Sequence, residues 1–167
     1  SDQNYPNYKI SNDNKNINEN IISVDYVDGF SMLINKEKFK DDVFFDENFF
    51  LYLENTDLCL RAKKRNQNIF VIKNSFITHL GAASITSKDL EYLRNWHWMW
   101  SKFYFNKKHY GFFNAFFKVI LNLASAIFKY VFYLILFNSH KKKIYLMRLC
   151  GLYNSIIGKK SWFRLND

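Results

Sequence analysis

Two carboxylates directly follow an aromatic run in the first half of the chain. The stretch FFLYLENTDLCLR, residues 49–61, passes at once from aromatic and aliphatic side chains to an acid, an amide, a hydroxyl and a second acid. A carboxylate within hydrogen-bond reach of a hydroxyl group can accept its proton, so Glu54 and Asp57 are candidates for acid–base chemistry. Each has a structural alternative. Glu54 would be a solvated acid at a helix start, and Asp57 would pair with Arg61, four residues along the same helix face.

The elements around these acids indicate an α/β layer. Asn55 can cap a helix over residues 56–65, since its side chain can accept from the first free N–H groups. The helix residues expected to face inward are Leu58, Cys59 and Ala62. Short apolar runs typical of strands lie at residues 21–27, 30–34, 69–72 and 76–81. Asp28 and Gly29, between the first two runs, mark a turn or a close approach of the backbone.

Composition and charge divide the chain into two parts. The sequence is 49% apolar and 20% aromatic, which excludes disorder as its main state. Residues 1–87 carry 10 Lys/Arg against 12 Asp/Glu, and residues 88–167 carry 14 against 3, so the basic excess lies in the second part. Cys59 and Cys150 lie far apart in apolar surroundings, which suits reduced structural thiols. The strands of the first part are too few for a complete doubly wound sheet, so we expect a domain truncated at its N-terminus.

The second part predicts a helix that meets a membrane surface. An almost continuous apolar run, residues 112–137, is crossed at helical spacing by a polar stripe of Asn114, Lys118, Asn122, Ser125 and Lys129. Basic clusters at residues 107–109 and 140–143 flank this run, as in interfacial helices that bind anionic headgroups. A membrane span is disfavoured, because Lys118 and Lys129 would each cost about 2.5 to 3.5 kcal/mol near a bilayer centre. The alternative is a buried amphipathic helix that closes the domain.

The aromatic segment before that helix is assigned to the same surface. Its aromatic side chains among lysines would suit base stacking, but the adjoining helix is too apolar for a phosphate groove, so we exclude a nucleic-acid partner. Residues of the types that form membrane-interface belts are Trp96, Trp98, Trp100, Tyr104 and Tyr110. We therefore expect residues 88–167 to form amphipathic, membrane-associated α-helices.

Three segments together resemble a known enzyme family. VDYVDGFSMLINKEKF, then FDENFFLYLENTDLCLR, then THLGAAS, are similar to the C-terminal part of bacterial family 2 glycosyltransferases of the rhamnosyltransferase-like group, over roughly residues 21–110. The resemblance implies a GT-A (Rossmann-like) α/β fold, a nucleotide-sugar donor, an inverting transfer and a divalent metal, Mg²⁺ or Mn²⁺. The family's nucleotide-binding half, with its metal-binding Asp-x-Asp, would precede Ser1. We expect the chain to be inactive without that half.

The resemblance assigns roles to the acidic stretch. In the family the aromatic run ends in Glu-Asp-x-Asp-Leu-x-x-Arg, and the acidic pair beside the acceptor supplies the general base. Glu54 and Asp57 match the first and last acids and Arg61 the arginine, whereas Asn55 replaces the family's usual Asp. An amide cannot act as a base. Glu54 then takes that role, with Asp57 as a second catalytic residue and Asn55 and Arg61 beside the substrate; the alternatives are an altered geometry or an inactive protein.

Two further motifs carry over from the family. His79 in THLGAAS resembles the C-terminal histidine near the donor diphosphate, a candidate metal ligand, although taken alone it would be an ordinary loop residue. Gly81 and Ser84 follow in the pattern His-x-Gly-x-x-Ser and could contact phosphate. Asp28 and Gly29 resemble the family's substrate-side turn, where the missing side chain lets a sugar lie close. An ordinary strand turn is the alternative.

These inferences combine into one expected function and one alternative. We expect an inverting hexosyltransferase that moves a sugar from a nucleotide-sugar donor to a lipid-linked saccharide acceptor in cell-surface polysaccharide synthesis. It would be cytoplasmic and peripheral on the inner face of the cytoplasmic membrane, bound to anionic lipids. The alternative is a catalytically inactive, membrane-bound interaction domain of the same fold, because the chain has Asn55 at the acid position and no Asp-x-Asp.

Overall fold

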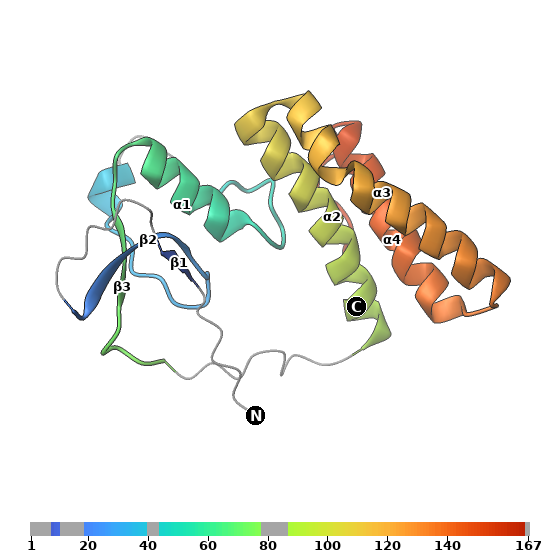
Figure 1. Cartoon of the computed structure of the whole chain (residues 1–167), viewed down its shortest axis with the longest axis horizontal. Coiled ribbons are helices and arrows are strands. Elements are labelled where there is room, and N and C mark those ends of the chain that lie inside the picture. Colours follow the sequence, from blue (N-terminus) through green and yellow to red (C-terminus); the bar gives the residue numbers. More distant parts are fainter. Residues whose placement is uncertain (1–7, 11–18, 40–43, 78–86, 166–167) are drawn as a thin grey trace. The chain divides into compact units, whose positions relative to one another are not determined.

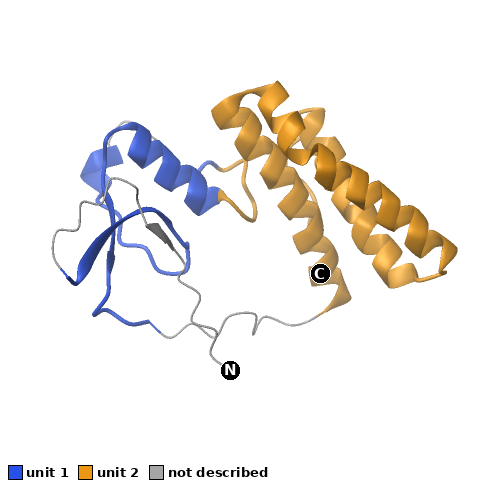
Figure 2. Ribbon diagram, in the orientation of Figure 1, with its two compact units in different colours: residues 1–46, 54–80 blue, residues 47–53, 81–167 orange. Residues whose placement is uncertain are grey.

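Two compact units make up the structure, which is a computed structural model (Figure 1, Figure 2). It describes residues 8–10, 19–39, 44–77 and 87–165. The sheet unit comprises residues 1–46 and 54–80, and the helical unit comprises residues 47–53 and 81–167. A small sheet and four α-helices in the described residues give a mixed α and β structure, which agrees with the α/β class at this coarse level.

The sheet unit is built on three antiparallel strands in the order β1-β2-β3. Their bounds are Tyr8–Ile10 for β1, Ile21–Val27 for β2 and Ile69–Ile72 for β3. In β2, Ile22 pairs with Val71 and Val24 with Ile69, and both β2 side chains are buried. The two predicted strands at residues 21–27 and 69–72 are therefore confirmed. They are antiparallel neighbours, whereas a doubly wound sheet is mostly parallel.

Helix α1, Glu54–Lys64, packs against β2 within the same unit. Its buried apolar residues are Leu58, Cys59 and Ala62, as the sequence predicts. The helix begins before the expected residue 56, so Asn55 lies in its first turn and the predicted cap is wrong. Tyr52 and Leu53, just before the helix, have φ of 68° and 69°, a left-handed conformation that is uncommon outside glycine.

The predicted strand at residues 30–34 is absent from the described structure. Those residues form a turn and an irregular segment that leads into a short 3₁₀ helix, Lys36–Phe39. Met32 and Ile34 pack on the cluster of Phe39, Leu58 and Ala62, so their alternation reflects contact with α1 rather than pairing with a strand. Of the predicted strand at residues 76–81, residues 76 and 77 are not in a strand and the rest lies outside the described residues.

Three long helices form the helical unit, and each packs against the other two. They are α2 (Lys88–Tyr110), α3 (Phe112–Ile135) and α4 (Ser139–Ile156). Ser87 caps α2 through a hydrogen bond from Leu90 N (3.1 Å), and Asn138 caps α4 in the same way. Gly111, with φ of 86°, makes the sharp junction between α2 and α3. The shared core consists of Met99, Phe103, Ala115, Val119 and Leu152.

The aromatic run before α1 belongs to this helical core. Phe49 is buried against Trp96 and Trp100, and Ser101 Oγ donates to Leu51 O at 2.6 Å. Because Trp96 and Trp100 are 1% and 2% exposed, they cannot lie at headgroup depth, and the predicted aromatic belt is wrong for these two. The helical unit thus takes in residues 47–53 as well as the region from residue 88 onward that the sequence assigns to it.

Candidate functional site

Glu54 is the first residue of α1 and the first of the two predicted catalytic acids. Its Oε2 atom is buried and has no hydrogen-bond partner among the described residues. The side chain as a whole is partly exposed, so it is not sealed inside the core. An unpaired buried carboxylate oxygen costs about 1 to 3 kcal/mol or more, which a native protein seldom retains without a reason. A hydroxyl donor from outside the described chain would satisfy it.

Asn55 has a structural role in the sheet unit. Its Nδ2 donates to Val27 O at 2.8 Å, which ties the first turn of α1 to the end of β2. A Cβ atom on Gly29 would lie 3.3 Å from Asn55 Cβ, so the Asn55 side chain lies against this glycine. The space beside the Asp28-Gly29 turn, which the resemblance assigns to a sugar, is therefore bounded by Asn55. A carboxylate at residue 55 could not donate this bond.

Asp57 and Arg61 form the predicted ion pair. Arg61 Nε lies 2.9 Å from Asp57 Oδ2, and the Asp57 side chain is 0% exposed. The guanidinium also donates through Nη2 to the carbonyl oxygen of Phe44, which fixes it from a second side. Removing one partner of such a buried pair would leave the other charge uncompensated, so the pair has a structural role. The structural reading of this pair is confirmed, and the catalytic role of Asp57 stays a prediction.

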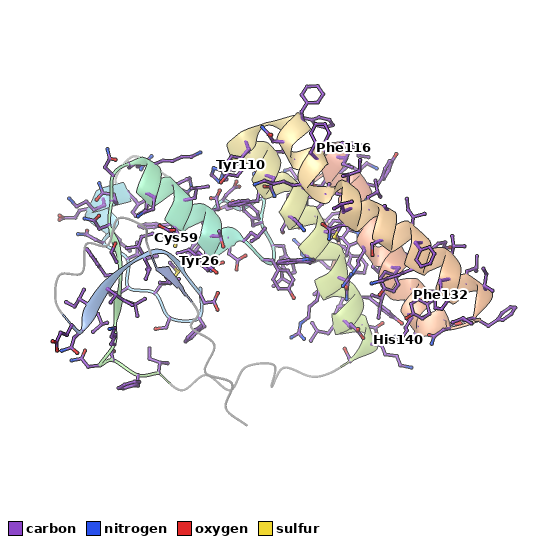
Figure 3. The ribbon with its side chains drawn as sticks, viewed as in Figure 1. Tyr26, Cys59, Tyr110, Phe116, Phe132 and His140 are labelled. Carbon is purple, nitrogen blue, oxygen red and sulfur yellow. The ribbon has the colours of Figure 1, made fainter. Side chains whose placement is uncertain are left out.

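The buried thiol of Cys59 lies between α1 and the sheet (Figure 3). Burial raises the pKa of the Cys59 thiol, and a backbone hydrogen bond with Val27 opposes that shift only in part. Burial likewise raises the pKa of Cys150. Both thiols are free and remain protonated near neutral pH, so they lack the thiolate that nucleophilic or metal chemistry requires. This agrees with the expected structural thiols.

A largely apolar cavity of about 880 Å³ lies in the sheet unit. Its apolar walls include Phe30, Ile34, Phe70, Phe76 and Ile77. Asp28 lines this cavity, whereas Gly29 and the acids of α1 do not. The sequence pattern predicts strands at residues 30–34 and 76–81, so it does not indicate this cavity.

The remaining predicted site residues have no described position. His79, Gly81 and Ser84 lie outside the described residues. Within the part of the chain that the structure covers, no group of three or more His, Cys, Asp or Glu side chains could hold a metal ion. The described residues therefore do not fit a metal site, and the divalent metal stays a prediction about His79 and the nucleotide-binding half.

Helix α3 presents a broad apolar surface to its surroundings (Figure 3). Its buried residues are Ala115, Val119 and Ala126, and the partly buried Phe116 and Leu123 pack against the same core. Large apolar side chains exposed on the outer side are Phe113, Phe117, Leu121, Phe128, Val131 and Ile135. In the described residues, this 24-residue helix alone is long and apolar enough to cross a membrane, judged by length and composition. The coarse expectation of a membrane-associated helix is thus supported.

The polar stripe of α3 lies along one flank of its packed side. Asn122 accepts from Lys102 Nζ of α2 at 2.7 Å. Lys118 and Lys129 lie over the rings of Tyr110 and Tyr145, at 4.4 Å and 5.6 Å from the ring centroids. The lysines therefore interrupt the run in sequence but leave the outer face of α3 uncharged. The stripe and the outer apolar face make α3 amphipathic along its exposed surface.

Comparisons of the chain with protein-family models, with curated proteins and with solved structures found no match. The family resemblance accordingly rests on the three sequence segments alone. The geometry of Glu54 and the surface of α3 are the features on which a functional proposal can be built.

Proposed function

We propose that the chain is the acceptor-side part of a membrane-associated inverting glycosyltransferase of the GT-A type, and that Glu54 is its general base. The observation that carries this proposal is the buried, unpartnered Oε2 atom of Glu54. The neighbouring polar side chains are already paired. Asn55 is bonded to Val27 and Asp57 to Arg61, so Glu54 is the acid left to accept a proton from a substrate hydroxyl.

The transfer places simple demands on Glu54. An acceptor hydroxyl donates its hydrogen bond to the carboxylate, and its oxygen attacks the anomeric carbon of the donor sugar as the proton moves to Glu54. The new C–O bond forms as the bond to the nucleoside diphosphate breaks, which inverts the anomeric centre. A positioned general base of this kind typically contributes about 10²- to 10⁴-fold to the rate.

The exposed apolar face of α3 supports a lipid-linked acceptor. An in-plane helix buries its apolar face below the headgroups, and its flanking lysines attract anionic lipids. The helical unit contains all of residues 88–167, which carry 14 Lys/Arg against 3 Asp/Glu. We place the protein on the inner, cytoplasmic face of the cytoplasmic membrane, where its acceptor is a lipid-linked saccharide.

The inactive interaction domain remains the second candidate. The paired state of Asn55 and Asp57 favours it, because Asn55 ties α1 to β2 and Asp57 is bonded to Arg61, which in turn donates to Phe44 O. In that case Glu54 would have no catalytic role, and the protein would bind membranes without transferring sugar.

An assay of nucleoside diphosphate release separates the two candidates. The protein translated from its complete reading frame is incubated with UDP-, GDP- and dTDP-hexoses, with Mg²⁺ or Mn²⁺, in the presence and absence of bacterial membranes. The proposed enzyme releases nucleoside diphosphate from at least one donor, faster with membranes than without. Absence of membrane-dependent release from every donor supports the interaction domain instead.

A further inference from the structure

A small pocket of about 210 Å³ lies within the helical unit. Its lining residues are Tyr52, Arg94, Asn95, Trp98 and Arg148. They come from the aromatic run, from α2 and from α4. Two arginines share the pocket, and no acidic side chain is among its described lining residues. Two unneutralised guanidinium groups at one small site favour an anionic ligand.

Arg148 is held in position for such a ligand. Its Nε donates to Asn95 Oδ1 at 2.7 Å, and Asn95 Nδ2 in turn donates to Glu91 O at 2.8 Å. The guanidinium lies 5.4 Å from the centroid of the Tyr145 ring. With Nε committed to Asn95, the two terminal nitrogens of Arg148 remain as donors. This fork matches the oxygens of a phosphate group.

Arg94 and Trp98 complete the pocket on α2. Arg94 makes no hydrogen bond or ion pair with the described part of the chain, so its whole guanidinium is available. Trp98 is 41% exposed, and Tyr52 meets it edge-on with the two planes at 89°. This leaves an aromatic surface beside the two cations. A sugar ring attached to the phosphate suits such a surface, since ligand sites combine apolar walls with a few polar anchors.

We propose that this pocket binds the phosphate group of a sugar phosphate, with Arg94 and Arg148 on the phosphate and Trp98 against the ring. The pocket lies next to the polar stripe of α3, because Arg148 and Lys129 both lie over the Tyr145 ring. A phosphate attached to a membrane lipid is thus one source of the ligand, and a free sugar phosphate is the other. The inference goes beyond the proposed transfer at Glu54 and is tested by binding alone.

Calorimetric titration of the detergent-solubilised chain tests the pocket. The probes are glucose 1-phosphate, glucose, and phosphatidic acid or phosphatidylcholine in mixed micelles. If the ligand is a free sugar phosphate, glucose 1-phosphate should bind and glucose should not. If the phosphate is attached to a membrane lipid, phosphatidic acid should bind in preference to phosphatidylcholine. Failure of both phosphate probes to bind overturns the proposal.

Two variants and a control locate the binding. Because Arg94 has no partner in the described chain, Arg94→Gln leaves the fold intact and should weaken phosphate binding at least about tenfold, through loss of charge-assisted hydrogen bonds. Arg148→Lys keeps the charge but loses the fork, and should also weaken binding.

The control, Lys107→Gln, removes one positive charge from an exposed position elsewhere on α2. Equal affinities for Arg94→Gln and Lys107→Gln would refute the assignment. Glu54 is unchanged in all three, so failure here leaves the transfer proposal standing.

Discussion

At the scale of single residues, the acidic stretch separates into paired and unpaired groups. Asp57 is fully buried and bonded to Arg61, and Asn55 is bonded to the backbone of β2. Glu54 keeps a buried oxygen without a partner among the described residues. Residues that stabilise a fold have their polar groups satisfied, whereas a residue that acts on a ligand can leave one open for it. This contrast makes stability and activity separable by mutation.

Asp57→Asn should destabilise the protein strongly while Glu54→Gln should not. Removing one member of a buried ion pair typically costs about 3 to 5 kcal/mol, because the other charge loses its partner. Glu54→Gln instead removes a charge whose buried oxygen has no donor, so the free energy of unfolding should stay the same or rise. Urea unfolding followed by circular dichroism measures both. A loss in Glu54→Gln as large as that in Asp57→Asn would make Glu54 a structural acid.

Asn55→Asp should destabilise the protein, although it restores the residue type usual in the resembling family. The carboxylate would place an oxygen near Val27 O, where Nδ2 now donates at 2.8 Å. Loss of that bond and the repulsion between two acceptors should cost about 1 to 3 kcal/mol. The control is Asn55→Ala, which removes the bond without adding charge and should be less harmful. Greater stability in Asn55→Asp than in the wild type would mean that the bond to Val27 is not formed.

The buried histidine of α2 makes the helical unit sensitive to acid. His97 Nε2 lies 2.7 Å from Phe163 O and Nδ1 lies 2.9 Å from Ser161 Oγ, so the neutral ring donates from Nε2 and accepts at Nδ1. Burial, aided by the charge of Arg164, lowers the pKa of His97 to about 4, despite the raising effect of the bond to Phe163. The unfolded chain, with a pKa of about 6.5, takes up a proton more readily.

This pKa difference predicts how stability changes with pH. The contribution of His97 is present above about pH 6.5 and is lost as the pH falls toward 4, by roughly 3 kcal/mol in total. The free energy of unfolding at pH 7.5 and pH 4.5 is compared for the wild type and His97→Gln, whose amide can still donate to Phe163. The wild type should lose about 2 to 3 kcal/mol more than the variant. Equal losses would show that His97 does not titrate in this window.

At the scale of the elements, the proposed membrane binding rests on α3. Its fully buried residues are the small Ala115, Val119 and Ala126, with Phe116 and Leu123 partly buried against the same core, while most of its other large apolar residues point outward. A soluble helix has the opposite distribution, with its large apolar side chains packed inside. The lysines lie on a flank, over tyrosine rings, where they can remain at headgroup depth while the outer face inserts.

Exchanging Lys118 and Ile120 should weaken binding to anionic vesicles several-fold. The exchange keeps composition and charge but moves the ammonium about 160° around the helix, from the flank to the apolar face. One well-placed lysine contributes about 1 kcal/mol of attraction to an anionic leaflet. The matched control exchanges Ser125 and Lys129, both within the polar stripe. Flotation with phosphatidylglycerol vesicles measures both variants. Indifference to the first exchange, together with insensitivity to salt, would contradict an in-plane α3.

Sequence patterns predicted the elements with strong local signals. The apolar period of residues 112–135 and the β-branched run of residues 21–27 gave a helix and a strand that the structure contains. The alternation in residues 30–34 did not correspond to a strand, because Met32 and Ile34 pack against α1 and do not pair with a strand. The burial of Trp96 and Trp100 could not be predicted either. Local spacing does not reveal that residues 47–53 and the segment after α4 cover them.

The candidate site was predictable only in part. The i, i+4 spacing indicated the Asp57–Arg61 pair, and the structure contains it. The bond from Asn55 to Val27 joins residues 28 positions apart, and the Arg148–Asn95 bond joins residues 53 positions apart, so neither has a local signal. The arginine pocket likewise depends on how α2 and α4 pack. Interactions set by tertiary contact are the ones that sequence spacing alone misses.

At the scale of the whole molecule, the two units divide the proposed task. The sheet unit carries Glu54 at the start of α1, and the helical unit carries the exposed apolar face of α3 and the arginine pocket. A transferase that acts on a lipid-linked acceptor needs a base for the hydroxyl and a surface that holds the protein at the bilayer. The chain offers a candidate for each, and the proposed transferase activity depends most on the base, Glu54.

The most direct test compares Glu54→Gln with Glu47→Gln in the protein translated from the complete reading frame. Glu47 is an exposed acid in the same acidic and aromatic stretch, so it controls for loss of one negative charge. Nucleoside diphosphate release is measured with membranes and the donor that the wild type turns over. If Glu54 is the general base, Glu54→Gln lowers kcat by about 10²- to 10⁴-fold with donor affinity unchanged, while Glu47→Gln keeps near wild-type activity. Transfer by Glu54→Gln at the rate of Glu47→Gln would contradict that role.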